Sequence, residues 1–351
     1  MSQGETTENS QEQKMTALSR EEIGAAISFF QERLVGQPEV VQTLSNVLYK
    51  QNALLKRILE HGQDEEHPVG VPADPTVLLF LGGSWGKSLA TRLIAMALSR
   101  LRRGSLTVLT PLPQDPEGRL NIEPRLVAAP FSSVVIENVE SVGQINARFV
   151  ANLAHLLDSG VIAIVDPVQK AIQPIPLGLC TFIMTTNIAD KEIREVLNPV
   201  TRLGFLQPAD EQAPDADAKY LEVQQVCMKQ LDLLPHELLR TVDETVVLRP
   251  LSENDLRQVF DLEIEHFQQA MFPGQSLPIV FEGEAKESLF DEARDGLGIY
   301  GAHALRRVLQ RHVDPVVYRA YNEGILTEDN LPQHQVMVRP DGPGVNVELA
   351  P

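Results

Sequence analysis

A lysine and a serine follow a glycine-rich turn directly after an apolar run, in the order LLFLGGSWGKS over residues 78–88. This pattern outlines a phosphate-binding loop, in which backbone N–H groups surround the phosphates, a lysine contacts them and a hydroxyl holds Mg²⁺. Lys87 and Ser88 would supply those two side chains. Gly82 and Gly86 are separated by three residues, one fewer than usual. The sequence therefore predicts an altered phosphate site.

Two interpretations of this loop remain open. In the first, Lys87 and Ser88 still bind ATP or ADP weakly, because a helix that begins after Gly86 offers free N–H donors and a positive dipole end. In the second, the loop is a remnant, and Trp85 packs into the pocket that a phosphate would occupy. The residue types alone are compatible with both interpretations.

Strand-like and helix-like segments alternate around this loop. Apolar strands are expected at 77–81, 106–109, 133–136, 179–184 and 246–248, and helices at 39–59, 87–101 and 144–157. Near-continuous apolar strands separated by helices are typical of a parallel sheet covered on both faces. From residue 252 the pattern becomes mainly helical, with helices at 252–271, 284–293 and 302–322 and short strands at 279–281 and 335–338. We expect an α/β domain over 18–250, a smaller domain over 251–351, and a disordered tail over 1–17.

The composition restricts the possible partners. The chain has 351 residues and a formal net charge of −18, so its surface repels phosphate backbones and anionic lipid. We therefore expect binding to neither nucleic acid nor membrane, and no apolar stretch reaches membrane-spanning length. Cys180 and Cys227 are the only cysteines, which favours free thiols in a reducing compartment. With a polar N-terminal stretch, this indicates the cytoplasm.

Five segments resemble the Clp family of AAA+ ATPases, most closely the C-terminal AAA+ module of its disaggregase-type members. They read ERLVGQ (32–37), LLFLGGSWGKS (78–88), FIMTTN (182–187), DETVVLRPL (243–251) and YGAHALRR (300–307). The likeness covers about residues 30–345. It implies an AAA+ P-loop module with a parallel sheet flanked by helices, followed by a small, mostly helical lid domain with a short sheet. It also implies ATP or ADP with Mg²⁺ as cofactor and other protein subunits as partners.

The resemblance places two residues at the positions that perform hydrolysis. In the segment VVIENVE, Glu137 aligns with the aspartate that steadies Mg²⁺, and Asn138 with the glutamate that polarises the attacking water. Glu137 and Ser88 are therefore the expected magnesium ligands. An amide is not a useful base at neutral pH, and a missing base costs about 10² to 10⁴ in rate. We expect hydrolysis to be weak or lost.

Three further family positions have counterparts in this chain. Asn187 matches the family's sensor 1 residue, whereas His303 replaces the arginine of sensor 2. Arg306 and Arg307 follow on the same helix and are either partial substitutes for that arginine or part of a solvated face. The arginine finger depends on the alignment: one choice puts Thr241 there, and another puts Arg240 there. The resemblance thus assigns nucleotide contacts to Gly82, Gly86, Lys87, Ser88, Asn187 and His303.

A feature of the family is also absent from the sequence. Residues 110–130 contain no tyrosine and no aromatic pore-loop motif of the kind that grips a threaded polypeptide. The leading hypothesis is therefore a degenerate Clp-like protein, a pseudo-ATPase that acts as a structural or regulatory subunit in a homo-oligomer or a mixed AAA+ ring. The alternative is an active, ATP-dependent protein-remodelling chaperone, in which Glu137 or Glu140 acts as the base and Arg240 acts in trans.

Overall fold

The computed structural model describes residues 17–61, 74–83, 86–102, 106–109, 120, 132–141, 147–165, 172–197, 216–271, 277–300, 303–327, 329–342 and 344–350. The tail expected over residues 1–17 lies outside this part except for its last residue. Trp85 and almost all of residues 110–130 also lie outside it. Within the described residues, no helix combines the length and the apolar character that crossing a membrane requires.

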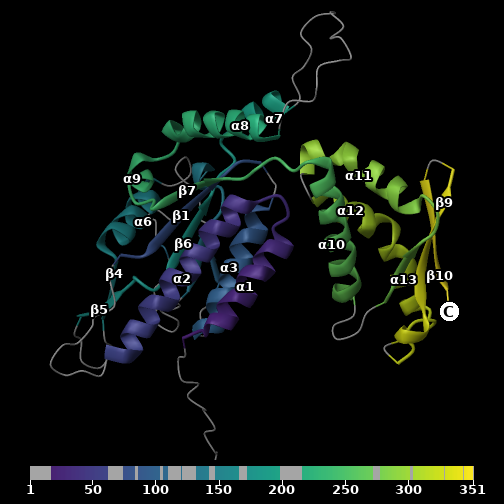
Figure 1. Ribbon diagram of the computed structural model, residues 1–351, viewed down its shortest axis with the longest axis horizontal. Coiled ribbons are helices and arrows are strands. Elements are labelled where there is room, and N and C mark those ends of the chain that lie inside the picture. Colours follow the sequence, from purple (N-terminus) through teal and green to yellow (C-terminus); the bar gives the residue numbers. More distant parts are fainter. Residues whose placement is uncertain are drawn as a thin grey trace, which may run out of the picture.

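A five-stranded parallel sheet forms the centre of the larger body (Figure 1). Its order is β2-β3-β6-β1-β7, so the strand before the glycine loop lies between β6 and β7. All five strands agree with the sequence-based prediction, and the α/β fold is confirmed. Their bounds are β1 (Thr76–Leu81), β2 (Leu106–Leu109), β3 (Ser133–Ile136), β6 (Thr181–Thr185) and β7 (Glu244–Val247).

Helices cover both faces of this sheet, which explains why its central strands are almost entirely apolar. Side chains alternate along β1: Leu78 and Phe80 join one core cluster, while Leu79 and Leu81 join the other. The first cluster packs against α1 (Arg20–Arg33), α2 (Pro38–His61) and α3 (Lys87–Arg102). The second packs against α6 (Ala147–Ser159), α7 (Asp190–Leu197), α8 (Ala216–Gln230) and α9 (His236–Leu239).

The C-terminal body has a core of its own, in which Phe260 and Phe290 lie with ring centroids 6.0 Å apart. It combines four helices with a three-stranded sheet of order β10-β9-β8. Figure 1 shows this body beside the larger one, joined to it by the segment that follows β7. Its elements are α10 (Glu253–Met271), β8 (Ile279–Phe281), α11 (Ala285–Tyr300), α12 (His303–His312), α13 (Asp314–Asn322), β9 (Gln335–Asp341) and β10 (Gly344–Ala350).

One helix prediction was wrong, and several elements were missed. The single helix expected over 302–322 is two helices, α12 and α13, because Pro315 stands in the first turn of α13 and cannot donate the hydrogen bond that a continuous helix needs. Strand β10 pairs antiparallel with β9 and was not expected. The antiparallel pair of β4 (Val161–Val165) and β5 (Ile172–Pro176) was missed as well, as were α7 and α8.

Candidate functional site

A cleft of about 320 Å³ lies between the larger body and the C-terminal body. It opens at the carboxyl ends of β1, β3 and β6, where parallel sheets commonly bind ligands. Apolar residues such as Leu34, Leu251 and Val259 line it together with polar ones. The cleft brings together most residues that the sequence assigned to the site: Gly86, Lys87, Ser88, Glu137, Asn138, Asn187 and His303.

Two glycines shape the loop between β1 and α3. Gly82 has φ +107° and Gly86 has φ +116°, in a region that side chains other than hydrogen disfavour. A Cβ on Gly82 would lie 3.2 Å from both the backbone N and O of Leu248, whereas a Cβ on Gly86 would meet no atom within 4 Å. Glycine is therefore required at position 82 for two reasons: the backbone has a positive φ, and the segment after β7 approaches too closely for a Cβ.

Substituting Gly82 by alanine is expected to lower the free energy of unfolding by about 1 to 3 kcal/mol, because the added Cβ meets backbone and the residue stays at positive φ. Urea unfolding at neutral pH measures the change. Gly24→Ala is the matched control: Gly24 lies within α1, where a Cβ would meet no atom within 4 Å, so alanine is expected to stabilise by about 0.5 to 1 kcal/mol. Equal effects of both substitutions would contradict the loop geometry.

The ammonium group of Lys87 is turned back into the protein. It donates to the backbone oxygen of Thr186 at 2.7 Å, and also to the backbone oxygen of Gly82 and to Oδ1 of Asn187. An ammonium group has three N–H donors, so these acceptors use all of them. The residue is only 7% exposed. Burial lowers the pKa of Lys87 to about 8, against the opposing effects of Asp190 and Glu140.

Asn187 connects Lys87 to the end of β3. Its Nδ2 donates to Oδ1 of Asn138 at 2.6 Å, and its backbone N–H donates to Oε1 of Glu140 at 3.2 Å. Asn138 has φ +53°, and asparagine is one of the few residues other than glycine that adopt this left-handed conformation readily. Both asparagines are thus engaged in a network that ends at the lysine.

The remaining predicted contacts are exposed side chains on the rim of the cleft. Ser88 and Glu137 offer a hydroxyl and a carboxylate, which are oxygen ligands of the type that Mg²⁺ prefers. His303 begins α12 on the opposite side. Ser88 and Glu137 therefore suit a magnesium contact. Lys87, in its observed hydrogen bonds, has no N–H donor left for a phosphate.

Several predicted residues do not line the cleft, among them Gly82, Glu140, Arg240 and Thr241. Gly82 lies below it and accepts a hydrogen bond from Lys87. Arg240 follows α9 and forms an ion pair with Asp158 at the end of α6, with 65% of its side chain exposed. An arginine that acts on a neighbouring subunit would also lie outside its own cleft, so a finger role for Arg240 stays a prediction.

Sequence reasoning missed part of the lining. Arg33 and Arg92 contribute cationic groups, and Glu263 and His266 contribute polar groups from α10. Helical periodicity places such residues on a helix face, but it does not show which body that face meets. The charge of Arg33, Arg92 and Arg306 makes the lining more cationic than the acidic chain as a whole, which favours an anion.

Comparisons with known proteins agree with this architecture. A family model described as the C-terminal, D2-small domain of ClpB protein matches residues 251–331. The Chaperone protein ClpB of Staphylococcus epidermidis is 22% identical over 343 residues, covering 92% of this chain and 34% of that protein. The ClpB of Tropheryma whipplei is 32% identical over 90 residues, 26% of this chain and 12% of that protein. The chain therefore spans about a third of the length of the first of these relatives.

Two solved structures share the fold. A closed-state reconstruction of Hsp104 with ATPγS and casein has a TM-score of 0.62 at 16% identity, covering 95% of this chain and 53% of that one. The Saccharomyces cerevisiae Hsp104–ADP complex has a TM-score of 0.60 at 17% identity, covering 91% and 50%. The chain therefore shares the fold of these Hsp104 structures. The resemblance to Clp-family modules of the disaggregase type, ClpB and Hsp104 among them, is confirmed.

Proposed function

We propose that this chain is a degenerate Clp-like AAA+ protein that binds nucleotide weakly or not at all, hydrolyses little or none, and acts as a structural or regulatory subunit. The division into domains at 18–250 and 251–351 belongs to this proposal. The observation that carries it is the position of Lys87, whose three donors are used by Gly82, Thr186 and Asn187. Lys87 would have to leave these acceptors before it could contact a bound triphosphate.

The position of the catalytic base gives independent support. Asn138 is an amide, and its oxygen already accepts from Asn187. Glu140, the alternative base, lies at the other side of Asn187 and accepts its backbone N–H at 3.2 Å. It does not line the cleft. Among the described residues, Glu137 is the carboxylate of this strand end that faces the cleft, and its proposed role is to hold Mg²⁺.

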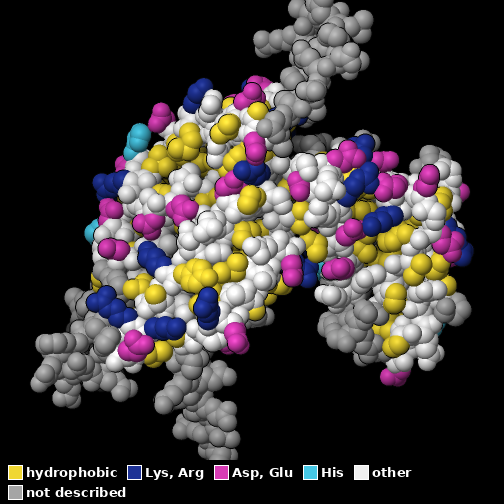
Figure 2. Space-filling view, in the orientation of Figure 1, with side chains coloured by type: hydrophobic (Ala, Val, Ile, Leu, Met, Phe, Trp, Pro, Cys, Tyr) yellow, Lys and Arg dark blue, Asp and Glu magenta, His cyan; other side chains and the backbone are white. Residues whose placement is uncertain are grey.

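Apolar side chains on the surface support a role in binding other protein subunits. Large apolar residues are exposed on four of the described helices: Tyr49 and Leu59 on α2, Leu89 and Met96 on α3, Leu221 and Met228 on α8, and Tyr318 and Tyr321 on α13. Figure 2 shows apolar patches among the charged groups on one face of the molecule. A homo-oligomer or a mixed ring with an active relative would cover such patches.

A second candidate is an active protein-remodelling ATPase. It is favoured by the presence of Ser88, Glu137 and Asn187 in one cleft and by the likeness to ClpB and Hsp104. It requires Lys87 to leave its internal acceptors when nucleotide binds. The two candidates therefore differ in whether Lys87 contributes to nucleotide affinity.

Calorimetric titration of the protein with Mg–ATP and Mg–ADP separates them. We expect dissociation constants no tighter than about 1 mM, equivalent to about −4 kcal/mol, because Lys87 has no donor available to the phosphates. Lys87→Ala is expected to leave this weak binding unchanged, as is Lys50→Ala, a control at an exposed position of α2. Micromolar binding that is lost in Lys87→Ala and kept in Lys50→Ala would contradict the proposal.

A further inference from the structure

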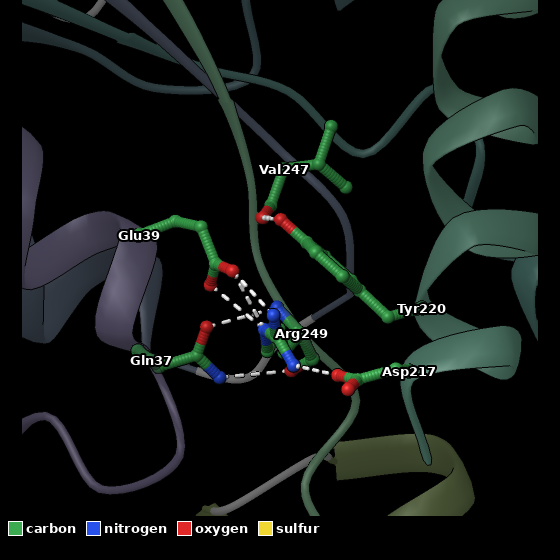
Figure 3. Close-up of polar contacts among 6 residues, drawn as sticks. All are labelled: Gln37, Glu39, Asp217, Tyr220, Val247 and Arg249. Carbon is green, nitrogen blue, oxygen red and sulfur yellow. Dashed lines mark hydrogen bonds and ion pairs between the residues drawn. The ribbon is translucent and has the colours of Figure 1, made fainter. Parts of the chain in front are cut away.

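Arg249 lies in the segment that joins the two bodies, between β7 and α10. Its guanidinium contacts residues from two other elements (Figure 3). Nε lies 2.9 and 2.8 Å from the two carboxylate oxygens of Glu39, at the start of α2, and Nη1 lies 2.6 Å from Oδ1 of Asp217, at the start of α8. Cζ lies 4.2 Å from the ring centroid of Tyr220. The guanidinium group thus forms hydrogen bonds to two carboxylates through its N–H groups and stacks on an aromatic ring through one face.

The backbone of the same residue is fixed as well. Its N–H donates to Oε1 of Gln37 and its carbonyl accepts from Nε2 of Gln37, both at 2.8 Å. Gln37 is 2% exposed. Two residues earlier, the carbonyl of Val247 accepts from the hydroxyl of Tyr220 at 3.0 Å. Gln37, Glu39, Asp217, Tyr220 and Arg249 are called the Arg249 cluster below.

The joint is also fixed on its far side. A Cβ on Gly36 would lie 3.0 Å from Cγ of Asp255 and 3.1 Å from Leu251, so the turn between α1 and α2 packs closely against the start of α10. There Asp255 and Ser252 cap the helix: the backbone N–H of Ser252 donates to Oδ2 of Asp255 at 2.9 Å, and the backbone N–H of Asp255 donates to Oγ of Ser252 at 3.2 Å. The joint is therefore held both before and after Pro250.

These contacts leave little rotational freedom in the joining segment. Arg249 and its partners belong to the larger body, so these contacts fix the joining segment as far as Arg249. Rotation of the C-terminal body would have to occur after Arg249, and it would separate Gly36 from Asp255 and Leu251. Arginine suits this position because its rigid fork can meet two carboxylates while its face stacks on an aromatic ring; lysine offers a single point charge.

We propose that the Arg249 cluster, which anchors the joining segment, and the close packing of Gly36 against Asp255 together lock the joint and set the orientation of the C-terminal body without any ligand in the cleft. The cleft then has a fixed shape, because Gln37 and Leu251 both line it and both take part in the contacts that hold the joint. This inference does not depend on the proposed loss of hydrolysis, since it concerns the joint alone.

The experiment measures the distance between the two bodies by pulsed electron paramagnetic resonance. Spin labels are attached at Lys56→Cys on α2 and Glu323→Cys after α13, both exposed positions. The native cysteines are buried, and burial raises the pKa of Cys180 to about 12 and that of Cys227 to about 11, so they react slowly with the label. We expect one narrow distance distribution, the same with and without Mg–ATP.

Arg249→Ala is expected to broaden that distribution at least twofold, and Arg249→Lys to broaden it less. Arg257→Ala is the matched control, because Arg257 also pairs with two carboxylates, Glu253 and Glu287, and lies over the ring of Phe290, but entirely within the C-terminal body. It should leave the distribution unchanged. A broad distribution in the unsubstituted labelled protein, or no broadening in Arg249→Ala, would overturn the proposal. If Arg249→Ala does not fold, Arg249→Lys is the test, and a distance distribution as narrow as that of the unsubstituted labelled protein would overturn the proposal.

Discussion

Replacing Asn138 by glutamate is expected to leave ATP turnover at the background rate of the buffer. A positioned base is worth about 10² to 10⁴ in rate, but the other groups that it would work with are engaged elsewhere. Lys87 is held by three internal acceptors, and Arg240 pairs with Asp158. An arginine finger is worth about 10³ to 10⁵ in other phosphoryl-transfer systems, so a restored base alone yields no useful rate. A coupled assay with excess Mg–ATP measures the turnover.

The same substitution is expected to lower stability, since glutamate at φ +53° costs about 1 to 2 kcal/mol. Asn138→Gly is the control for this effect, because glycine adopts the left-handed conformation without penalty and supplies no base. It should fold at least as well as Asn138→Glu and remain equally inactive. Steady turnover by Asn138→Glu that is absent from Asn138→Gly would show that the assignments of Arg240 and His303 are wrong.

The buried ammonium of Lys87 is expected to make stability rise with pH between about pH 8 and pH 10.5. Burial holds its folded-state pKa at about 8, below the ordinary value of 10.5. In this window the unfolded chain binds more protons at Lys87 than the folded chain does, so the free energy of unfolding increases with pH. The penalty for the buried charge is fully present below pH 8 and is relieved as the group loses its proton. Its size is about 3 kcal/mol.

Urea unfolding of the unsubstituted protein and of Lys87→Met is measured at several pH values from about 7.5 to about 10.5. This range covers the window between the folded-state pKa of Lys87 and its ordinary value, so the comparison isolates the contribution of Lys87. The unsubstituted protein should gain about 3 kcal/mol relative to Lys87→Met across the window. The thiols of Cys180 and Cys227, whose raised pKa values act in the opposite direction, largely cancel in the comparison. Lys50→Met, at an exposed lysine, should show no such change. If the difference in free energy of unfolding between the unsubstituted protein and Lys87→Met does not change with pH, Lys87 is solvated and extends into the cleft.

The strands of the central sheet were predictable because they are buried on both faces and their apolar runs are nearly continuous. In β1, β3 and β6 every residue is buried, and these strands were placed within two residues of their ends. The C-terminal body was harder. Pro315 is a break signal within the expected helix 302–322, and it was overlooked. Strand β10 is half-buried along most of its length, so its apolar pattern is weak, and its place is set by pairing with β9.

The residue types of the site could be predicted, but their contacts could not. The motif identifies Lys87 as the lysine of a phosphate loop; it does not show that the side chain turns back to Gly82 and Asn187. Arg249 was missed for a related reason. Its partners Glu39 and Asp217 lie 210 and 32 residues away in the sequence, and no local pattern links them. Such pairs depend on the assembled fold.

Steady-state conversion of ATP to ADP by the purified chain with Mg²⁺ shows whether hydrolysis has been lost. We expect ADP to form at the background rate of the buffer, because the donors of Lys87 are used internally and Asn138 stands at the base position. The same result is expected for Lys87→Ala. Conversion over many cycles that disappears in Lys87→Ala, and persists in Lys50→Ala, would contradict the proposed loss of hydrolysis.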